Sequence, residues 1–451
     1  MSGTVLILAF VISMAFLFVS IMKFKMHPFF SMVISGALAG MICGMDIVTI
    51  VGYLTSGLGG VMTSIGLLII LGCLIGNLLA ESGATDSLAS KLCDVFGNSK
   101  SSLAMNITGF ITSIPVYWGT AFIILNPMLK TLSKKTKKSI QVYVTALTIG
   151  LIVTHCLVIP TPGPLAVAGT LGANLGWFIF YSLIIAALAS LVGGWIYGEW
   201  LGKKQYPYNE AAEETDSAEQ EKTPANIAPA GKALFLILLP LLLIVIGTVT
   251  PLVSSNATVL AVAGTLSTGQ GVVALAISAI VGLIMLRKNI NKPISKIVTE
   301  TISFIGDPIL VLCAGGAYGA VVSATGIGNY LGENIASWNV SIILLAFLFT
   351  AIMRTALGSP VVGMVTCSSI LAPIITSLGA SPVIVGLAIC AGSIPICAPN
   401  DPCYWMIKDL SGIPEKDVVK TFTVGGVIAS LISLAIIFLL QVCRGFLPGL
   451  G

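Results

Sequence analysis

The sequence predicts an all-α polytopic membrane protein with about ten transmembrane helices plus two re-entrant hairpins, arranged as two inverted repeats. Three observations support this fold class. Hydrophobic residues make up 56% of the 451 residues and charged residues only 9%, whereas a soluble domain carries about 25% charged residues. Two long apolar stretches are broken near their middles, and the basic residues are distributed as they are in the cytoplasmic loops of a membrane protein.

The same composition excludes several classes of function. A net charge of +4 on so apolar a chain is too small for a protein that binds nucleic acid through its phosphates. Two histidines are too few for a His-rich metal site. The sequence therefore predicts no cofactor and no nucleic-acid partner, and the lipid bilayer is the expected surrounding.

Ten apolar stretches are the clearest candidates for membrane crossings, because a helical span needs roughly 20 apolar residues. They are 3–22, 27–45, 61–80, 141–160, 176–200, 232–252, 270–286, 306–325, 383–400 and 422–442. Two further stretches, 103–129 and 341–378, are interrupted at Ser113 to Thr120 and at Arg354 to Pro360. Each of these two is either a spanning segment or a re-entrant hairpin.

The positive-inside rule favours the hairpins, since short cytoplasmic loops collect Lys and Arg. If both stretches are hairpins, one side of the membrane holds all but two of the 22 basic residues, and only Arg354 and Arg444 are left over. If both stretches cross, most of the basic residues lie outside and the rule is inverted. We therefore expect ten crossings with both termini outside.

This topology gives two halves of opposite orientation, the plan of many secondary transporters. We expect a first inverted repeat at 1–201, with five spans and a cytoplasm-facing hairpin at 103–129. An acidic cytoplasmic linker at 202–231 follows. The second repeat, 232–451, has five spans and an outside-facing hairpin at 341–378. Glycines recur between the halves: Gly72 and Gly76 return 243 positions later as Gly315 and Gly319.

Four breaks in the apolar segments mark the expected transport site. Irregular backbone at membrane depth is tolerated only where protein or a watery cavity covers it. Two breaks are the hairpin tips, and the other two are the proline-rich runs 159–164 and 397–402. The exposed N–H groups and helix dipoles at such breaks suit an anionic substrate.

Three ionisable residues lie at or near these breaks. Arg354 is a basic residue inside an apolar stretch; it either binds a substrate carboxylate, reaches toward the membrane surface, or pairs structurally with an acid. Asp401 is either a proton carrier or a helix-end residue in a cytoplasmic loop. His155 is either a proton relay or a hydrogen-bonded packing residue. Tyr117 and Trp118 are either interface aromatics or part of the cavity wall.

At these residues the sequence resembles the gluconate permease family, the gluconate:proton symporters that include D-serine, idonate and fructuronate carriers. The resemblance covers nearly the whole chain, and its most specific parts are Thr154 to Pro164, Arg354 to Ser359, Ala391-Gly-Ser, Asn400-Asp401 and Tyr404-Trp405. It implies the ion-transporter-superfamily fold, with a scaffold that is often dimeric and a moving domain that carries the hairpins. Elevator-type alternating access and a homodimer are likewise implied.

The chain departs from the family pattern at two places. The family usually has a His before Pro-Gly-Pro, where this chain has Thr161, and a His-Val pair where this chain has Ala398-Pro399. Both departures remove an imidazole ring near the expected site.

The resulting hypothesis is a secondary active transporter, not an enzyme, in the bacterial inner membrane. It is expected to couple proton entry to uptake of a small hydroxylated organic acid such as gluconate or a related sugar acid. The alternatives are a carrier of D-serine or another small amino or hydroxy acid, and a Na⁺-coupled carboxylate symporter. Asp401, followed by His155, is assigned to proton coupling. The expected substrate-binding residues are Ser113, Gly119, Thr120, Thr161, Arg354, Gly358, Ser359 and Asn400.

Overall fold

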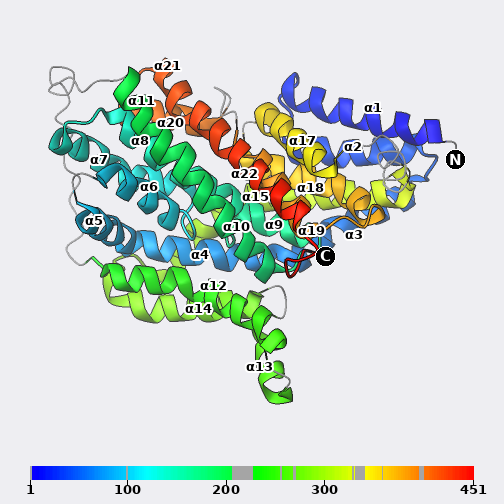
Figure 1. Ribbon diagram of the computed structural model, residues 1–451. Helices are drawn as coiled ribbons and strands as arrows, with labels where there is room; N and C mark the ends of the chain where they lie inside the picture. The colour runs from blue at the N-terminus through cyan, green and yellow to red at the C-terminus, as the bar shows by residue number, and fades with distance from the viewer. Residues whose placement is uncertain are drawn as a thin grey trace.

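All regular structure in the described part of the chain is helical, which confirms the all-α prediction (Figure 1). The computed structural model describes residues 3–97, 100–205, 227–253, 256–267, 271–327, 330, 341–357, 359–395 and 401–450. The helices of the first half are α1 (Gly3–Met22), α2 (Pro28–Ile42), α3 (Ile47–Val61), α4 (Leu67–Glu81), α5 (Ala84–Phe96), α6 (Ser101–Thr112), α7 (Trp118–Thr136), α8 (Ile140–Leu157), α9 (Pro162–Thr170), α10 (Leu175–Ser190) and α11 (Tyr197–Gln205). Those of the second half are α12 (Ala230–Val253), α13 (Ala257–Ser267), α14 (Val272–Leu286), α15 (Ile294–Thr325), α17 (Ile342–Leu357), α18 (Pro360–Ser377), α19 (Pro382–Gly392), α20 (Pro402–Ser411), α21 (Glu415–Val418) and α22 (Val424–Val442).

Seven helical segments within the described residues are long and apolar enough to cross a membrane, and several shorter apolar helices accompany them. The sequence assigned no element to residues 47–61, which form α3; its four glycines and its Thr, Ser and Tyr residues interrupt the apolar run there. The segment Pro360–Ser377, expected as one arm of a hairpin, is itself of crossing length. The number of crossings, their orientation and the homodimer stay predictions.

Both interrupted stretches form two helices joined at the expected break. In the first, α6 ends at Thr112 and α7 begins at Trp118. In the second, α17 ends at Leu357 and α18 begins at Pro360, with Ser359 as the N-cap. Proline suits the first turn of a helix because its missing N–H has no partner there in any case. That either pair re-enters the membrane on one side stays a prediction.

Two further helices are broken where proline-rich runs occur. α8 gives way at Leu157 to α9, which begins at Pro162, and the second break separates α19 from α20, which begins at Pro402. Each half of the chain thus contains a helix pair, a broken helix and then a long helix, α10 or α22. The division of the chain into two inverted repeats stays a prediction.

The broken helices lie in the centre of the molecule. Every residue of α8 from Val142 to Leu157 is buried, and so is every residue of α19 from Val383 to Gly392. The outer helices α1, α12, α14 and α22 instead leave large apolar side chains exposed, among them Leu8, Ile246, Ile284 and Leu439. An apolar outer face of this kind is suited to contact with lipid. α12 and α14 lie side by side in the lower part of Figure 1, above α13.

Glycine allows α6 and α8 to approach at backbone distance. A Cβ atom at Gly109 would lie 2.8 Å from the carbonyl oxygen of Leu147, and one at Gly150 would lie 3.1 Å from the backbone nitrogen of Phe110. Close packing through small residues is typical of helices inside membranes, because lipid offers no hydrophobic drive for helices to associate. This contact fixes the first helix pair against the central helix α8.

Candidate functional site

A buried ion pair joins the second helix pair to the second broken helix. Arg354 lies in the last turn of α17, and its Nη2 donates to Oδ2 of Asp401, the N-cap of α20. Both side chains are only 1% exposed. The other carboxylate oxygen of Asp401 accepts a hydrogen bond from the backbone N–H of Cys403 at 2.8 Å. Two charges so deeply buried require each other, since either one alone would carry a large desolvation penalty.

The environment of Arg354 is tightly packed. A Cβ atom at Gly363 of α18 would lie 3.2 Å from the backbone nitrogen of Arg354, so the two helices approach closely at this residue. Of the alternatives that the sequence left open for Arg354, the structure shows pairing with an acid. That acid is Asp401, the residue assigned to proton coupling.

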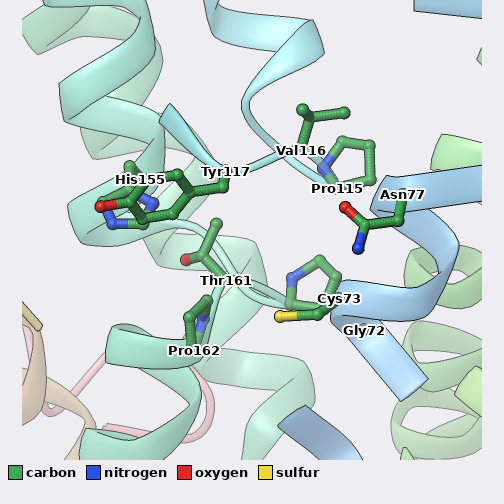
Figure 2. Close-up of a pocket in the computed structure, with 10 residues that line it drawn as sticks. Gly72, Cys73, Asn77, Pro115, Val116, Tyr117, His155, Thr161 and Pro162 are labelled. Atoms are coloured by element: carbon green, nitrogen blue, oxygen red, sulfur yellow. The ribbon is translucent and has the colours of Figure 1, made fainter. Parts of the chain in front are cut away.

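A small cavity lies in the first half of the chain, between α4, the turn that joins α6 to α7, and the break between α8 and α9 (Figure 2). It measures about 20 Å³, roughly the space that one water molecule needs. Its lining residues are Gly72, Cys73, Asn77, Pro115, Val116, Tyr117, His155, Pro160, Thr161 and Pro162.

Tyr117 and His155 form one wall of this cavity. Their rings meet edge to face with centroids 5.2 Å apart, as the adjoining sticks in Figure 2 show. His155 is 1% exposed. Sγ of Cys156, the residue after His155 in α8, lies 3.9 Å from the carbonyl oxygen of Ser393 at the end of α19, and a Cβ atom at Gly163 of α9 would lie 3.2 Å from Sδ of Met364 in α18. The cavity of the first half and the ion pair of the second half are therefore neighbouring parts of one polar region.

Four helices begin where the four breaks end. Their N-cap residues are Tyr117 for α7, Thr161 for α9, Ser359 for α18 and Asp401 for α20. The Ser359 hydroxyl accepts from the backbone N–H of Val362 at 3.4 Å, and the Thr161 hydroxyl donates to the carbonyl of Val158 at 2.5 Å. Helix N-termini present unpaired N–H groups and a positive dipole end, which together favour an anion such as a carboxylate.

The remaining predicted site residues are placed as follows. Ser113 is fully buried in the turn that joins α6 to α7, but it is not part of the cavity lining. Gly119 lies in α7 against α20, because a Cβ atom there would be 3.1 Å from Cε of Met406. Thr120 is in the first turn of α7, and its side chain is not among those that the structure describes. Gly358 and Asn400 lie outside the described residues. The substrate and proton roles of the whole set stay predictions.

The sequence did not single out one polar residue of the cavity. Asn77 of α4 points toward Pro115 and Val116 in Figure 2, and its Nδ2 donates to the hydroxyl of Thr301 in α15 at 2.7 Å. The sequence feature that could have identified Asn77 is a single amide side chain within the otherwise apolar run 67–80. Of the two aromatic residues at the first break, Tyr117 lines the cavity, whereas Trp118 is 1% exposed and stacks on Phe122.

Comparison with known proteins agrees with this architecture. Two solved transporters share the fold: YdaH from Alcanivorax borkumensis, with a TM-score of 0.65 at 14% identity over 89% of each chain, and MtrF from Neisseria gonorrhoeae, described as illuminating a class of antimetabolite efflux pumps. The second match has a TM-score of 0.61 at 14% identity and covers 87% of this chain and 83% of MtrF.

Several curated proteins align over almost the full length of the chain. An uncharacterized permease from Haemophilus influenzae is 33% identical over 90% of this chain and 86% of its own length. A gluconate permease from Pseudomonas aeruginosa is 29% identical over 94% and 95%. The D-serine transporter DsdX of Escherichia coli is 29% identical over 95% and 97%. The model of the GntP family permeases matches residues 5–443. The chain therefore belongs to the GntP family of permeases and is a multi-pass membrane transporter.

Proposed function

We propose that the protein is a secondary active transporter of the bacterial inner membrane that couples proton entry to the uptake of a small hydroxylated organic acid, such as gluconate or a related sugar acid. Its family membership and the gluconate permeases among its relatives support the substrate class. The buried pair of Arg354 and Asp401 is the observation that carries the coupling argument.

The coupling follows from competition for one cation. While Asp401 is ionised it holds Arg354, and a substrate carboxylate that approached Arg354 would meet a like charge. Protonation of Asp401 removes the negative charge from the pair and leaves the guanidinium to bind the substrate carboxylate instead. Because an unpaired buried cation is strongly unfavourable, proton binding and substrate binding promote each other. Each anion that enters is thereby accompanied by a proton.

The remaining polar groups complete this site. At the helix N-termini that follow Thr161 and Ser359, the prolines carry no N–H, so the backbone N–H groups of Gly163 and Val361 are the donors assigned to a carboxylate or hydroxyl oxygen of the substrate. Side-chain oxygens of Ser113, Thr120 and Thr161, together with Ser359 and Asn400, are assigned to the substrate hydroxyls. His155, beside Tyr117 and within the field of the ion pair, is the second group assigned to proton transfer.

Substrate entry requires the cavity to expand. Its volume of about 20 Å³ suits one water molecule, whereas a sugar acid is many times larger. We assign this opening to elevator-type alternating access, in which the core elements α6 to α9 and α17 to α20 move against the outer helices. In this proposal the buried helices around α8 and α19 form the moving part, and the outer helices α12 and α14, whose apolar faces are exposed, belong to the fixed part.

D-serine is the second candidate substrate. DsdX, a D-serine transporter, is as similar to this chain as the Pseudomonas aeruginosa gluconate permease, at 29% identity over nearly the full length. A carboxylate bound at Arg354 is common to both substrates. The distinction between them lies in the groups that contact the hydroxyl chain or the ammonium group.

Uptake into proteoliposomes tests the proposal. Purified protein is assayed with labelled gluconate and labelled D-serine under an inward proton gradient, an inward Na⁺ gradient, or neither. We expect accumulation only with the proton gradient and faster uptake of gluconate. Accumulation driven by the Na⁺ gradient alone would show that Na⁺, not the proton, is the coupling ion. Faster uptake of D-serine than of gluconate would show that D-serine is the preferred substrate.

The variant Asp401→Asn separates coupling from binding. Asparagine resembles a protonated aspartate, so we expect the variant to lose proton-driven accumulation but to retain exchange of internal for external substrate. Asp409→Asn is the matched control, because Asp409 lies on the same helix α20 with a side chain 66% exposed. Proton-driven accumulation by Asp401→Asn at the wild-type rate would refute the assigned role.

A further inference from the structure

A second polar site lies away from the transport region, at the end of the bundle where α6 and α8 begin and α11 lies beside them. It is an open pocket of about 640 Å³. Its lining consists of Lys100, Lys138, Trp195, Ile196, Glu199, Trp200 and Lys203. Three lysines and two tryptophans around one hollow are unusual in a chain with only 9% charged residues and six tryptophans. The proposed transport mechanism uses none of them.

The inner part of this pocket already holds one carboxylate of the chain itself. The carboxylate of Glu199 accepts from Nζ of Lys138 at 2.5 Å and also from the hydroxyl of Ser102. Lys100 is the N-cap of α6 and Ser139 the N-cap of α8, and neither helix start carries a side-chain cap. Both helices therefore begin here with N–H groups that favour negative charge.

The outer part of the pocket retains positive charge. Lys138 is neutralised by Glu199, whereas Lys100 and Lys203 have no carboxylate partner among the described residues. Both of these side chains are exposed at the rim. The pocket as a whole therefore has an excess of two positive charges.

The wall of the pocket is aromatic and faces outward. Trp200 is 48% exposed and Ile196 is 51% exposed. Trp200 stacks on Tyr197 with centroids 5.8 Å apart, and the Tyr197 hydroxyl donates to the carbonyl of Lys420 at 2.8 Å, so the ring is held in place. Tryptophan and tyrosine collect at the level of lipid headgroups, where one side of the ring is apolar and the other is wet. This wall suits a ligand with both a charged and an apolar part.

We propose that the pocket binds the headgroup of an anionic phospholipid of the phosphatidylglycerol or cardiolipin type. The phosphate would lie between Lys100 and Lys203, and the glycerol and upper acyl carbons against Trp200 and Ile196. Basic pockets between helices on the cytoplasmic side are suited to such headgroups. The three lysines come from three loops that the charge distribution predicts to be cytoplasmic.

A titration of delipidated protein in maltoside micelles tests the proposal. The melting temperature is followed with increasing dioleoyl phosphatidylglycerol, with dioleoyl phosphatidylcholine of the same chains, and with inorganic phosphate. A ligand that binds only the folded state raises the melting temperature by mass action. We expect stabilisation by phosphatidylglycerol alone. Equal stabilisation by phosphatidylcholine would show a hydrophobic effect, and equal stabilisation by phosphate would show a free-anion site; either result overturns the proposal.

The double variant Lys100→Gln/Lys203→Gln isolates the pocket. A lysine beside an anionic lipid contributes about a factor of five in affinity, so we expect roughly 30-fold weaker binding of phosphatidylglycerol. Lys23→Gln/Lys25→Gln is the matched control, since it removes the same charge from two exposed lysines between α1 and α2. Equal weakening in both double variants would assign the effect to overall charge and refute the pocket. If the pocket double variant does not fold, each single variant is expected to bind about fivefold more weakly.

Discussion

Breaking the Arg354–Asp401 pair is expected to destabilise the protein far more than removing both charges together. Asp401→Asn keeps an oxygen that can accept from the backbone N–H of Cys403, so the helix cap survives and only the charge is lost. The variant leaves the guanidinium of Arg354 buried at 1% exposure without its counter-charge. Removal of one partner from such a pair typically costs about 3–5 kcal/mol. Arg354→Met, which strands the carboxylate, is expected to cost a similar amount.

The double variant Arg354→Met/Asp401→Asn contains neither charge, and replacing a whole buried pair with uncharged groups is often close to neutral. We expect its free energy of unfolding to lie within about 1.5 kcal/mol of the wild-type value, so the coupling free energy of the cycle has a magnitude of about 4.5 kcal/mol or more. Unfolding in maltoside micelles by added dodecyl sulfate, followed by tryptophan fluorescence, gives the four free energies. A matched cycle on the exposed Lys408–Asp409 pair, 3.3 Å apart, is expected to give less than about 1 kcal/mol. A coupling at the buried pair no larger than that of the exposed pair would refute the reasoning.

Three further variants test other parts of the structure. Gly150→Val places a Cβ atom against the backbone carbonyl oxygen of Asn106, closer than van der Waals contact allows, and is expected to lower the unfolding free energy by about 3 kcal/mol or more in the same titration. Gly52→Ala meets nothing within 4 Å and is expected to be neutral or slightly stabilising. Asp46 caps α3 through Thr49, and these hydrogen bonds hold its pKa below the ordinary value of 3.8. Its contribution to stability is therefore full above pH 3.8 and is lost as the pH falls through the lowered pKa, so the melting temperatures of wild type and Asp46→Ala should converge only in that acid range. Asn77→Leu removes an amide from the cavity wall and is expected to raise KM for uptake, while Thr301→Val, which removes only the hydrogen-bond partner, should leave KM unchanged; equal KM effects would assign Asn77 a structural role.

Much of the helical pattern was predictable because it depends on local sequence. Apolar runs and proline positions are properties of neighbouring residues, and the starts of α9, α18 and α20 fall at Pro162, Pro360 and Pro402 as the breaks indicated. α3 was missed because its glycines and polar residues lower its hydropathy, although its packing against α15 supports a helix there.

The site was predictable only one residue at a time. Arg354 and Asp401 each stand out as charges in apolar surroundings, but 47 positions separate them, and only the folded chain brings them together. Asn77 gave a weak signal because one amide in an apolar helix is more often an interhelical hydrogen-bond donor than a ligand. Asn77 lines the cavity because α4 packs against the turn that joins α6 to α7. This packing cannot be predicted from the sequence of α4 alone.

The buried pair also determines how the membrane voltage acts on the proposed carrier. Empty, the pair is electrically neutral, because the charges of Arg354 and Asp401 cancel. Loaded with a proton and a gluconate anion, the site is neutral again, so neither the inward nor the return step moves charge. Moving one elementary charge across a membrane potential of 100 mV changes the free energy by about 2.3 kcal/mol, and the membrane potential would make no such contribution to gluconate uptake. A zwitterion such as D-serine would instead give the loaded site one positive charge, and its uptake would produce an inward current. Electrical recording from the same proteoliposomes therefore separates the two substrate classes.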